Sequence, residues 1–196
     1  MANASNGTAK VVYGLTAGIM AMALSVALLL PAAASAEERV CRGALGAITV
    51  DNLRVPQNAT CELTGTRVKG TIKVQRNAIL RAAQVRVIGN VQGENARNVV
   101  VRGSRVGGSV QVVQGRAATV RNTVVNADIL YDENRAALRA IDNTVGGNIQ
   151  AFQNSGGVQI SFNHVDGNLQ CKENVPRPTG GRNVVQGNKE DQCARL

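Results

Sequence analysis

The sequence predicts an all-β fold, a single-domain parallel β-helix of about seven to eight turns, and two observations lead to this prediction. A short phrase beginning with valine occurs seven times, and its starts lie 19, 19, 19, 20, 20 and 20 residues apart. A fixed period near 20 residues, with Gly and Asn at the corners, is typical of a coil whose turns stack. The chain also has no Trp and only two Tyr and two Phe. A narrow coil has no room for a thick aromatic core, so small β-branched residues must fill it.

The first element is an export signal over residues 1–36. Lys10 supplies positive charge, an apolar stretch follows from Val11 to Leu30, and Pro31 ends it. Ala34-Ser35-Ala36 fits a small-residue cleavage site, so we expect a secreted or extracytoplasmic protein whose β-helix domain covers residues 37–196. The alternative is a retained membrane anchor, because the apolar stretch approaches the ~20 residues needed to span a bilayer. With cleavage, the mature protein has no transmembrane segment.

Four cysteines in an exported chain predict two disulfides. Cys41 and Cys61 are 20 residues apart and Cys171 and Cys193 are 22 apart, about one turn in each case. The other two pairings would join opposite ends of a coil whose strands stack ~4.8 Å apart. A disulfide tolerates a Cα separation of only ~4.4–6.8 Å, so we expect Cys41–Cys61 and Cys171–Cys193, one staple at each end. A zinc site is the alternative, and the same distance argument disfavours it.

The repeats define columns, counted from the leading valine as position zero. The phrases are Val68–Ile72, Val87–Val91, Val106–Val110, Val125–Ile129, Val145–Ile149, Val165–Leu169 and Val185–Lys189. Position +4 is apolar in the first six phrases, which predicts an interior column. Position +2 is Gly in six phrases, which predicts a bend or a positive φ. Position +9, which is mostly Asn, predicts a second corner in the left-handed region.

The spacing leaves three short strands per turn, near +4 to +6, +11 to +15 and −2 to zero, and favours a right-handed coil. A left-handed coil of hexapeptide repeats is the alternative, but it needs a stricter turn of about 18 residues. In the last phrase Lys189 stands at the interior +4 position, which predicts that the coil stops there and repels the edge of another copy.

The pattern resembles parallel β-helix solenoids. The endings Gly167-Asn-Leu-Gln-Cys171 and Gly187-Asn-Lys-Glu-Asp-Gln-Cys193 are similar to those of uncharacterised secreted bacterial β-helix proteins. The resemblance covers most of residues 41–196 and implies this fold and export, with no catalytic residues and no cofactor. The turn length is also similar to that of bactofilins, which polymerise end to end. That similarity is architectural, because bactofilins are cytoplasmic and lack such a signal and such cysteines.

Basic charge is the strongest functional signal. Without residues 1–36 the chain keeps a net charge of +8, because Lys10 is the only charged residue of that segment. Between Arg67 and Arg121 there are eleven Lys or Arg and one acid, Glu94. The arginines repeat with the coil in three columns: Arg67, Arg86 and Arg105 at −1; Arg97, Arg116 and Arg135 at +10; Arg102 and Arg121 at −4. Directly opposed like charges are disfavoured in a sheet, so an anionic partner would relieve the columns. Ordinary solvated faces are the alternative explanation.

We expect that partner to be an anionic polysaccharide of the wall or the extracellular space, or lipid headgroups. Nucleic acid is less suited, because stacking of single strands needs aromatic side chains, and Tyr131, Phe152 and Phe162 lie outside the basic region. The only histidine, His164, reads as a surface residue, and no serine or cysteine has an evident His–acid partner. The sequence indicates no metal site.

Three hypotheses follow for the function. The first is a non-enzymatic structural or adhesive element of the cell envelope. The second is a polysaccharide-active lyase or hydrolase, which needs clustered carboxylates that the scattered acids do not obviously supply; Glu133 and Glu173 share one column but stand two turns apart. The third is the subunit of a self-assembling filament, which Lys189 disfavours. The sequence leaves the oligomeric state open.

Overall fold

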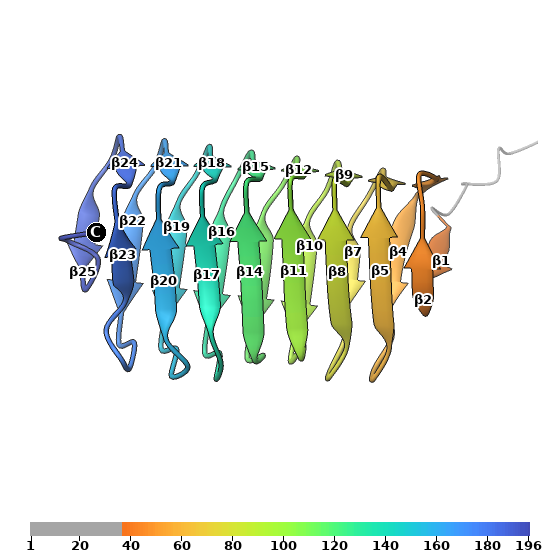
Figure 1. Cartoon of the computed structure of the whole chain (residues 1–196), viewed down its shortest axis with the longest axis horizontal. Helices are drawn as coiled ribbons and strands as arrows, with labels where there is room; N and C mark the ends of the chain where they lie inside the picture. The colour runs from red at the N-terminus through yellow and green to blue at the C-terminus, as the bar shows by residue number, and fades with distance from the viewer. Residues whose placement is uncertain (1–36) are drawn as a thin grey trace, which may run out of the picture. The chain divides into compact units, whose positions relative to one another are not determined.

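The chain winds into a coil in which each turn adds one strand to each of three parallel sheets (Figure 1). The structure, a computed structural model, describes residues 37–196. The expected export signal, residues 1–36, lies outside the described residues. The described part contains no helix, and its sheets have nine, eight and eight strands, about eight turns. The predicted all-β parallel β-helix is therefore confirmed.

The three sheets take every third strand of the chain. Sheet A consists of β1 (Glu38–Val40), β4 (Asn52–Val55), β7 (Ile72–Val74), β10 (Val91–Glu94), β13 (Val110–Val113), β16 (Ile129–Asp132), β19 (Ile149–Phe152), β22 (Leu169–Lys172) and β25 (Lys189–Asp191). Sheet B consists of β2 (Gly43–Leu45), β5 (Thr60–Thr64), β8 (Ile79–Ala83), β11 (Asn98–Arg102), β14 (Ala117–Arg121), β17 (Leu138–Ile141), β20 (Val158–Ser161) and β23 (Thr179–Gly181). Sheet C consists of β3 (Thr49–Val50), β6 (Arg67–Val68), β9 (Arg86–Val87), β12 (Arg105–Val106), β15 (Val124–Val125), β18 (Thr144–Val145), β21 (His164–Val165) and β24 (Val184–Val185).

The hand of the coil can be followed in Figure 1. Sheet B faces the viewer and its strands run upward, sheet C forms the top edge, and the strands of sheet A return behind. The chain meanwhile advances from right to left, so the coil is right-handed, as expected.

Apolar columns fill the interior layer by layer. Position +4 is fully buried from Leu53 through Ile72 and Val91 to Leu169, and the strand register pairs each residue with the next. The outward neighbours in the same strands are exposed or half-buried, because successive side chains on a strand point to opposite faces. One large aromatic side chain enters the core: Tyr131, whose hydroxyl donates to the Arg139 carbonyl at 2.8 Å.

The six glycines at +2 all lie in bends, which confirms one of the two expected conformations, whereas the positive φ is wrong. They are needed for close packing between turns. None of the six has a positive φ. A Cβ built on Gly89 would lie 2.7 Å from the carbonyl oxygen of Gly70 and 2.8 Å from Thr71 Oγ1 in the preceding turn. A side chain at this position would therefore push neighbouring turns apart.

The asparagines at +9 also differ from the expected left-handed corner, which only Asn77 adopts in that column (φ 55). Positive φ falls one residue earlier in later turns, at residues such as Gln114 and Glu133. The side chains of Asn134, Asn154 and Asn174 instead point inward and form a buried ladder. A second buried ladder joins three asparagines on the other side of the core: Asn143, Asn163 and Asn183.

These ladders leave the interior polar groups satisfied. Every amide of the two ladders donates to a main-chain carbonyl of the previous turn, such as Asn154 Nδ2 to Tyr131 O at 3.0 Å, and all but Asn183 also donate to an amide of the next turn. Among residues 37–196, no buried side-chain nitrogen or oxygen lacks a hydrogen-bond partner. The ladders therefore fix the register of neighbouring turns at no cost in unpaired polar atoms.

Both ends of the coil are stapled as predicted. Cys41 and Cys61 form one disulfide with a Cα–Cα distance of 5.6 Å, and Cys171 and Cys193 form the other at 5.2 Å. Each bond links residues of neighbouring turns, so the terminal turns cannot separate from the body of the coil.

Both ends of the apolar +4 column also carry a cation. Lys189 pairs with Leu169 in the register of sheet A, and Arg39 pairs with Leu53 at the other end. Both side chains are exposed. If one coil stacked end to end on another, these two cations would meet in the column that is otherwise apolar, which is a second obstacle besides the expected one at Lys189.

Candidate polyanion-binding surface

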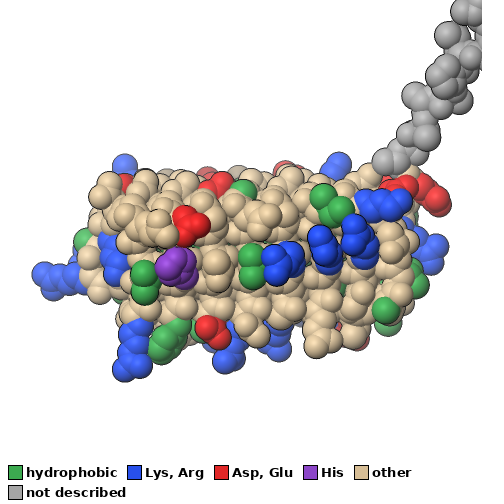
Figure 2. All heavy atoms as spheres, turned by 90° about the horizontal axis from the view of Figure 1, so that it is seen from above, with side chains coloured by type: hydrophobic (Ala, Val, Ile, Leu, Met, Phe, Trp, Pro, Cys, Tyr) green, Lys and Arg blue, Asp and Glu red, His purple; other side chains and the backbone are tan. Residues whose placement is uncertain are grey.

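The −1 arginines stand in a row on the outer face of sheet C. Arg67, Arg86 and Arg105 are the first residues of β6, β9 and β12, and the register pairs Arg67 with Arg86 and Arg86 with Arg105. The following valine of each strand is buried, so the arginine must point outward. Figure 2 looks onto this face and shows basic side chains that follow one another along the coil, with the histidine further along it. We call these three residues the arginine ladder.

The +10 arginines form a second column where each turn passes from sheet A to sheet B. The Arg97 carbonyl accepts a hydrogen bond from the N–H of Ala117 at 3.3 Å, and the Arg116 carbonyl accepts one from Ala136 at 3.1 Å. This bonding stacks Arg97, Arg116 and Arg135 in successive turns, all three exposed.

The −4 arginines end two neighbouring strands of sheet B. Arg102 closes β11, Arg121 closes β14, and the two are paired in register. The column does not continue, because Ala83 precedes Arg102 and Ile141 follows Arg121.

The three columns do not share one face of the coil. The −1 and −4 columns flank the corner between sheets B and C, because only Gly103 and Ser104 separate Arg102 from Arg105. The +10 column lies at the opposite edge of sheet B, one five-residue strand or ~16 Å away from Arg102. The structure thus confirms the columns and shows that basic charge borders sheet B on two sides.

None of these eight arginines forms an ion pair within the described part of the chain. Three carboxylates of the basic half are paired with other cations instead, in Arg54–Glu38 at 2.6 Å, Lys69–Asp51 at 2.9 Å and Arg81–Glu62 at 3.0 Å. Two unit charges about 4 Å apart repel by about 1 kcal/mol even in bulk water. The ladder therefore holds like charges at neighbouring positions with no carboxylate to offset them.

Charge is unevenly distributed along the coil. Residues 37–126 contain 14 Lys or Arg and five Asp or Glu, whereas residues 127–196 contain seven and eight. Beyond Arg105 the −1 column continues as Val124, Thr144 and His164. His164 Nε2 lies 3.5 Å from Asp166 Oδ1, so this side chain, unlike the three arginines, has a carboxylate beside it.

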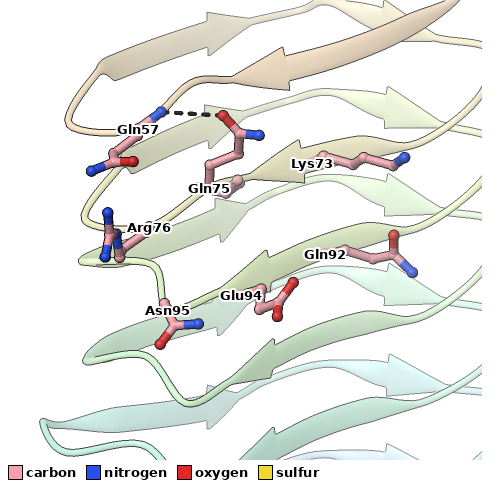
Figure 3. A pocket seen from close by; sticks show the side chains of 8 residues that line it. Gln57, Lys73, Gln75, Arg76, Gln92, Glu94 and Asn95 are labelled. Carbon is pink, nitrogen blue, oxygen red and sulfur yellow. Dashed lines mark hydrogen bonds between the residues drawn. The ribbon is translucent and has the colours of Figure 1, made fainter.

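A polar groove lies on the outer face of sheet A, near its corner with sheet B (Figure 3). It has a volume of about 490 Å³ and is lined by Gln57, Lys73, Val74, Gln75, Arg76, Gln92, Glu94 and Asn95. Sequence reasoning missed this groove. The outward columns at +5, +7 and +8 could be read from the repeat, but the hollow between them depends on how far each side chain extends.

The carboxylates do not converge on one place. Glu133 accepts a hydrogen bond from Gln114 at 3.0 Å and Glu173 accepts one from Gln153 at 2.9 Å, so the two are held in separate pairs. Within residues 37–196 no group of three His, Cys, Asp or Glu is placed to hold a metal ion. All four cysteines are in disulfides.

Two carboxyl groups have shifted pKa values. Burial, with the neighbouring charge of Glu133, raises the pKa of Asp132. The hydrogen bond and the charge of Lys69 lower the pKa of Asp51. Neither residue lines the groove.

No family of known proteins, no curated protein and no solved structure matches the chain. In the described part, no helix is long and apolar enough to cross a membrane.

Proposed function

We propose that this protein is a non-enzymatic structural or adhesive element outside the cytoplasm, which binds an anionic polysaccharide through the arginine ladder. The observation that carries the proposal is the in-register row of Arg67, Arg86 and Arg105 without a carboxylate partner in the described residues. Guanidinium groups bind carboxylates and sulfates through paired hydrogen bonds, and such bonds are stronger than those between neutral groups. An extended anion that follows the row offsets the repulsion that the ladder otherwise retains.

A linear polymer fits the arrangement better than a lipid surface does. The ladder runs along the coil axis at ~4.8 Å per step, so charges spaced along one chain can meet it in sequence. The +10 column lies at the opposite edge of sheet B from the other two columns, so a flat membrane cannot contact all three. Two disulfides and the expected export signal support a location outside the cytoplasm.

Retention on immobilised polygalacturonate tests the proposal. Arg86→Ala with Arg105→Ala removes the centre and one end of the ladder, and Arg177→Ala with Arg195→Ala removes the same charge from exposed sites outside the columns. We expect the ladder variant to bind about tenfold more weakly, which corresponds to about 1.4 kcal/mol, and the control to stay within about twofold. Equal weakening of the two variants would show that only net charge matters.

Salt and lipid provide two further comparisons. Binding through exposed arginines must weaken as ionic strength rises, because the Debye length falls from about 10 Å at 0.1 M to about 3 Å at 1 M. Retention that is unchanged by salt contradicts the proposal. Stronger ladder-dependent binding to anionic phospholipid vesicles than to polygalacturonate would assign the ladder to a membrane surface.

A further inference from the structure

We propose that the groove on sheet A is a second binding site, which recognises one acidic sugar residue with several free hydroxyl groups. In Figure 3, Lys73 and Gln92 lie side by side at one end, Arg76 and Asn95 lie at the turn, and Glu94 lies between. The groove is separate from the arginine ladder, because it belongs to sheet A and contains no residue of the three columns.

The polar side chains of the groove are largely unengaged. Among the described residues, Lys73, Arg76 and Glu94 take part in no ion pair, although both signs of charge line the same hollow. The amide contacts here are long: Gln57 N–H to Gln75 Oε1 is 3.3 Å and Gln92 Nε2 to Gln111 Oε1 is 3.4 Å. Hydrogen bonds of this length are weak, so a ligand displaces them at little cost.

In the C-terminal half of the coil, the side chains of the +5 and +8 columns form hydrogen bonds with one another. At +5, Gln150 donates to Gln170 at 2.9 Å and Gln170 donates to Glu190 at 2.8 Å. At +8, Gln153 donates to Glu173 at 2.9 Å. The fold therefore allows these columns to satisfy themselves, and the groove is the stretch of sheet A where they do not.

The chemistry of the lining selects the class of ligand. Arg76 at the turn and Lys73 at the other end each offer donors to a carboxylate, while Gln57, Gln92 and Asn95 carry amides that can both donate to and accept from hydroxyl groups. Glu94 accepts hydrogen bonds from hydroxyl groups but repels additional negative charge. This combination fits a hexuronate better than a sulfate, a phosphate or a densely charged polymer.

The size and stiffness of the groove suit such a ligand. A volume of about 490 Å³ falls within the usual ~300–1,000 Å³ of small-molecule sites. Lys73, Gln92 and Glu94 stand on β7 and β10, which are paired in register from Ile72–Val91 to Val74–Gly93, so these backbone positions are fixed before binding. The ordering cost is then limited to the side chains.

Isothermal titration with tri-galacturonate tests the inference, with neutral galactotriose as the matched ligand. We expect Arg76→Ala to weaken binding of the acidic trimer at least about tenfold, because it removes a charge-assisted pair. Lys172→Ala is the matched control, because Lys172 is an exposed cation of sheet A, at +7 and outside the groove. It should leave the affinity within about twofold.

The outcomes separate this site from the ladder. An affinity unchanged in both Arg76→Ala and Lys73→Ala, or equal affinity for the neutral trimer, would overturn the inference whatever happens on the polymer. Arg86→Ala with Arg105→Ala should weaken polymer retention and leave trimer binding unchanged. If that double variant retains the polymer fully while Arg76→Ala still loses the trimer, the ladder proposal fails and the groove proposal stands.

Discussion

Replacing Asn154 by alanine tests whether buried amides, and not only apolar columns, hold consecutive turns together. Its Nδ2 donates to Tyr131 O at 3.0 Å and to Asn174 Oδ1 at 2.8 Å, and its Oδ1 accepts from the main-chain N–H and the Nδ2 of Asn134 at 2.9 and 3.1 Å. Alanine removes all four of these hydrogen bonds and leaves the buried Asn134 N–H without any other partner. An unsatisfied buried polar group costs about 1–3 kcal/mol, so we expect a total loss of about 3–5 kcal/mol, including the small cavity.

Urea unfolding followed by far-ultraviolet circular dichroism, with the disulfides intact, measures this loss. Asn188→Ala is the matched control, because the Asn188 side chain is exposed at the last corner and only its main-chain N–H bonds to Asn168 Oδ1. The control should change the free energy of unfolding by less than about 0.5 kcal/mol. The midpoint should fall for Asn154→Ala at an unchanged slope. Losses of unfolding free energy that differ by less than about 1 kcal/mol between the two variants would refute the role of the asparagine ladder.

The pH dependence of the stability of Asn154→Asp tests the same hydrogen bonds in a second way. A carboxylate here would face the acceptors Tyr131 O and Asn174 Oδ1 without a proton to donate, and burial would raise its pKa above the unfolded value of about 3.9. The protonated acid can donate one hydrogen bond, so the variant should be least destabilised below about pH 4. The loss relative to wild type should grow as pH rises through the raised pKa. A loss that is the same at pH 3 and pH 7 would contradict this reasoning.

Three further predictions concern packing, titration and assembly. Gly89→Ala should destabilise the coil by more than about 2 kcal/mol, because its Cβ would meet a carbonyl oxygen of the preceding turn, whereas Gly46→Ala, with no atom within 4 Å, should change little in the same unfolding assay. Burial raises the pKa of Asp132, so ionisation of this carboxyl group destabilises the folded state. The destabilisation is absent below about pH 4 and grows as pH rises through the folded pKa, so Asp132→Asn should stabilise the protein at pH 7 and not at pH 3. Arg39→Leu with Lys189→Leu removes both cations from the ends of the apolar column and should increase light scattering with concentration, while wild type should not.

The repeat was sufficient to predict column membership, because the backbone period fixes which residues stack. This is why the disulfide partners, the three arginine columns and the position of Lys189 follow from counting. The reason for each residue type was harder to predict. A column of Gly fits a positive φ and a close approach equally well in sequence, and only the position of the Gly70 carbonyl relative to Gly89 distinguishes them.

The asparagine ladders and the groove could not be predicted from the repeat, for a related reason. Asparagine is favoured both at left-handed corners and in stacked amide rows, so the sequence does not say whether Asn154 faces outward or inward. The direction depends on whether the interior at that corner leaves space for an amide. The groove depends likewise on side-chain length and conformation at Lys73 and Arg76, which the repeat does not specify.

The −1 column itself shows that the fold does not require the arginine ladder. Val124, Thr144, His164 and Val184 occupy the same outward position in later turns, on two-residue strands paired in the same parallel register. Sheet C therefore accepts an apolar, a hydroxyl or an imidazole side chain there without a change in strand length. Because the fold does not require three consecutive arginines here, their presence is consistent with the proposal that an anionic chain along the coil axis offsets their repulsion.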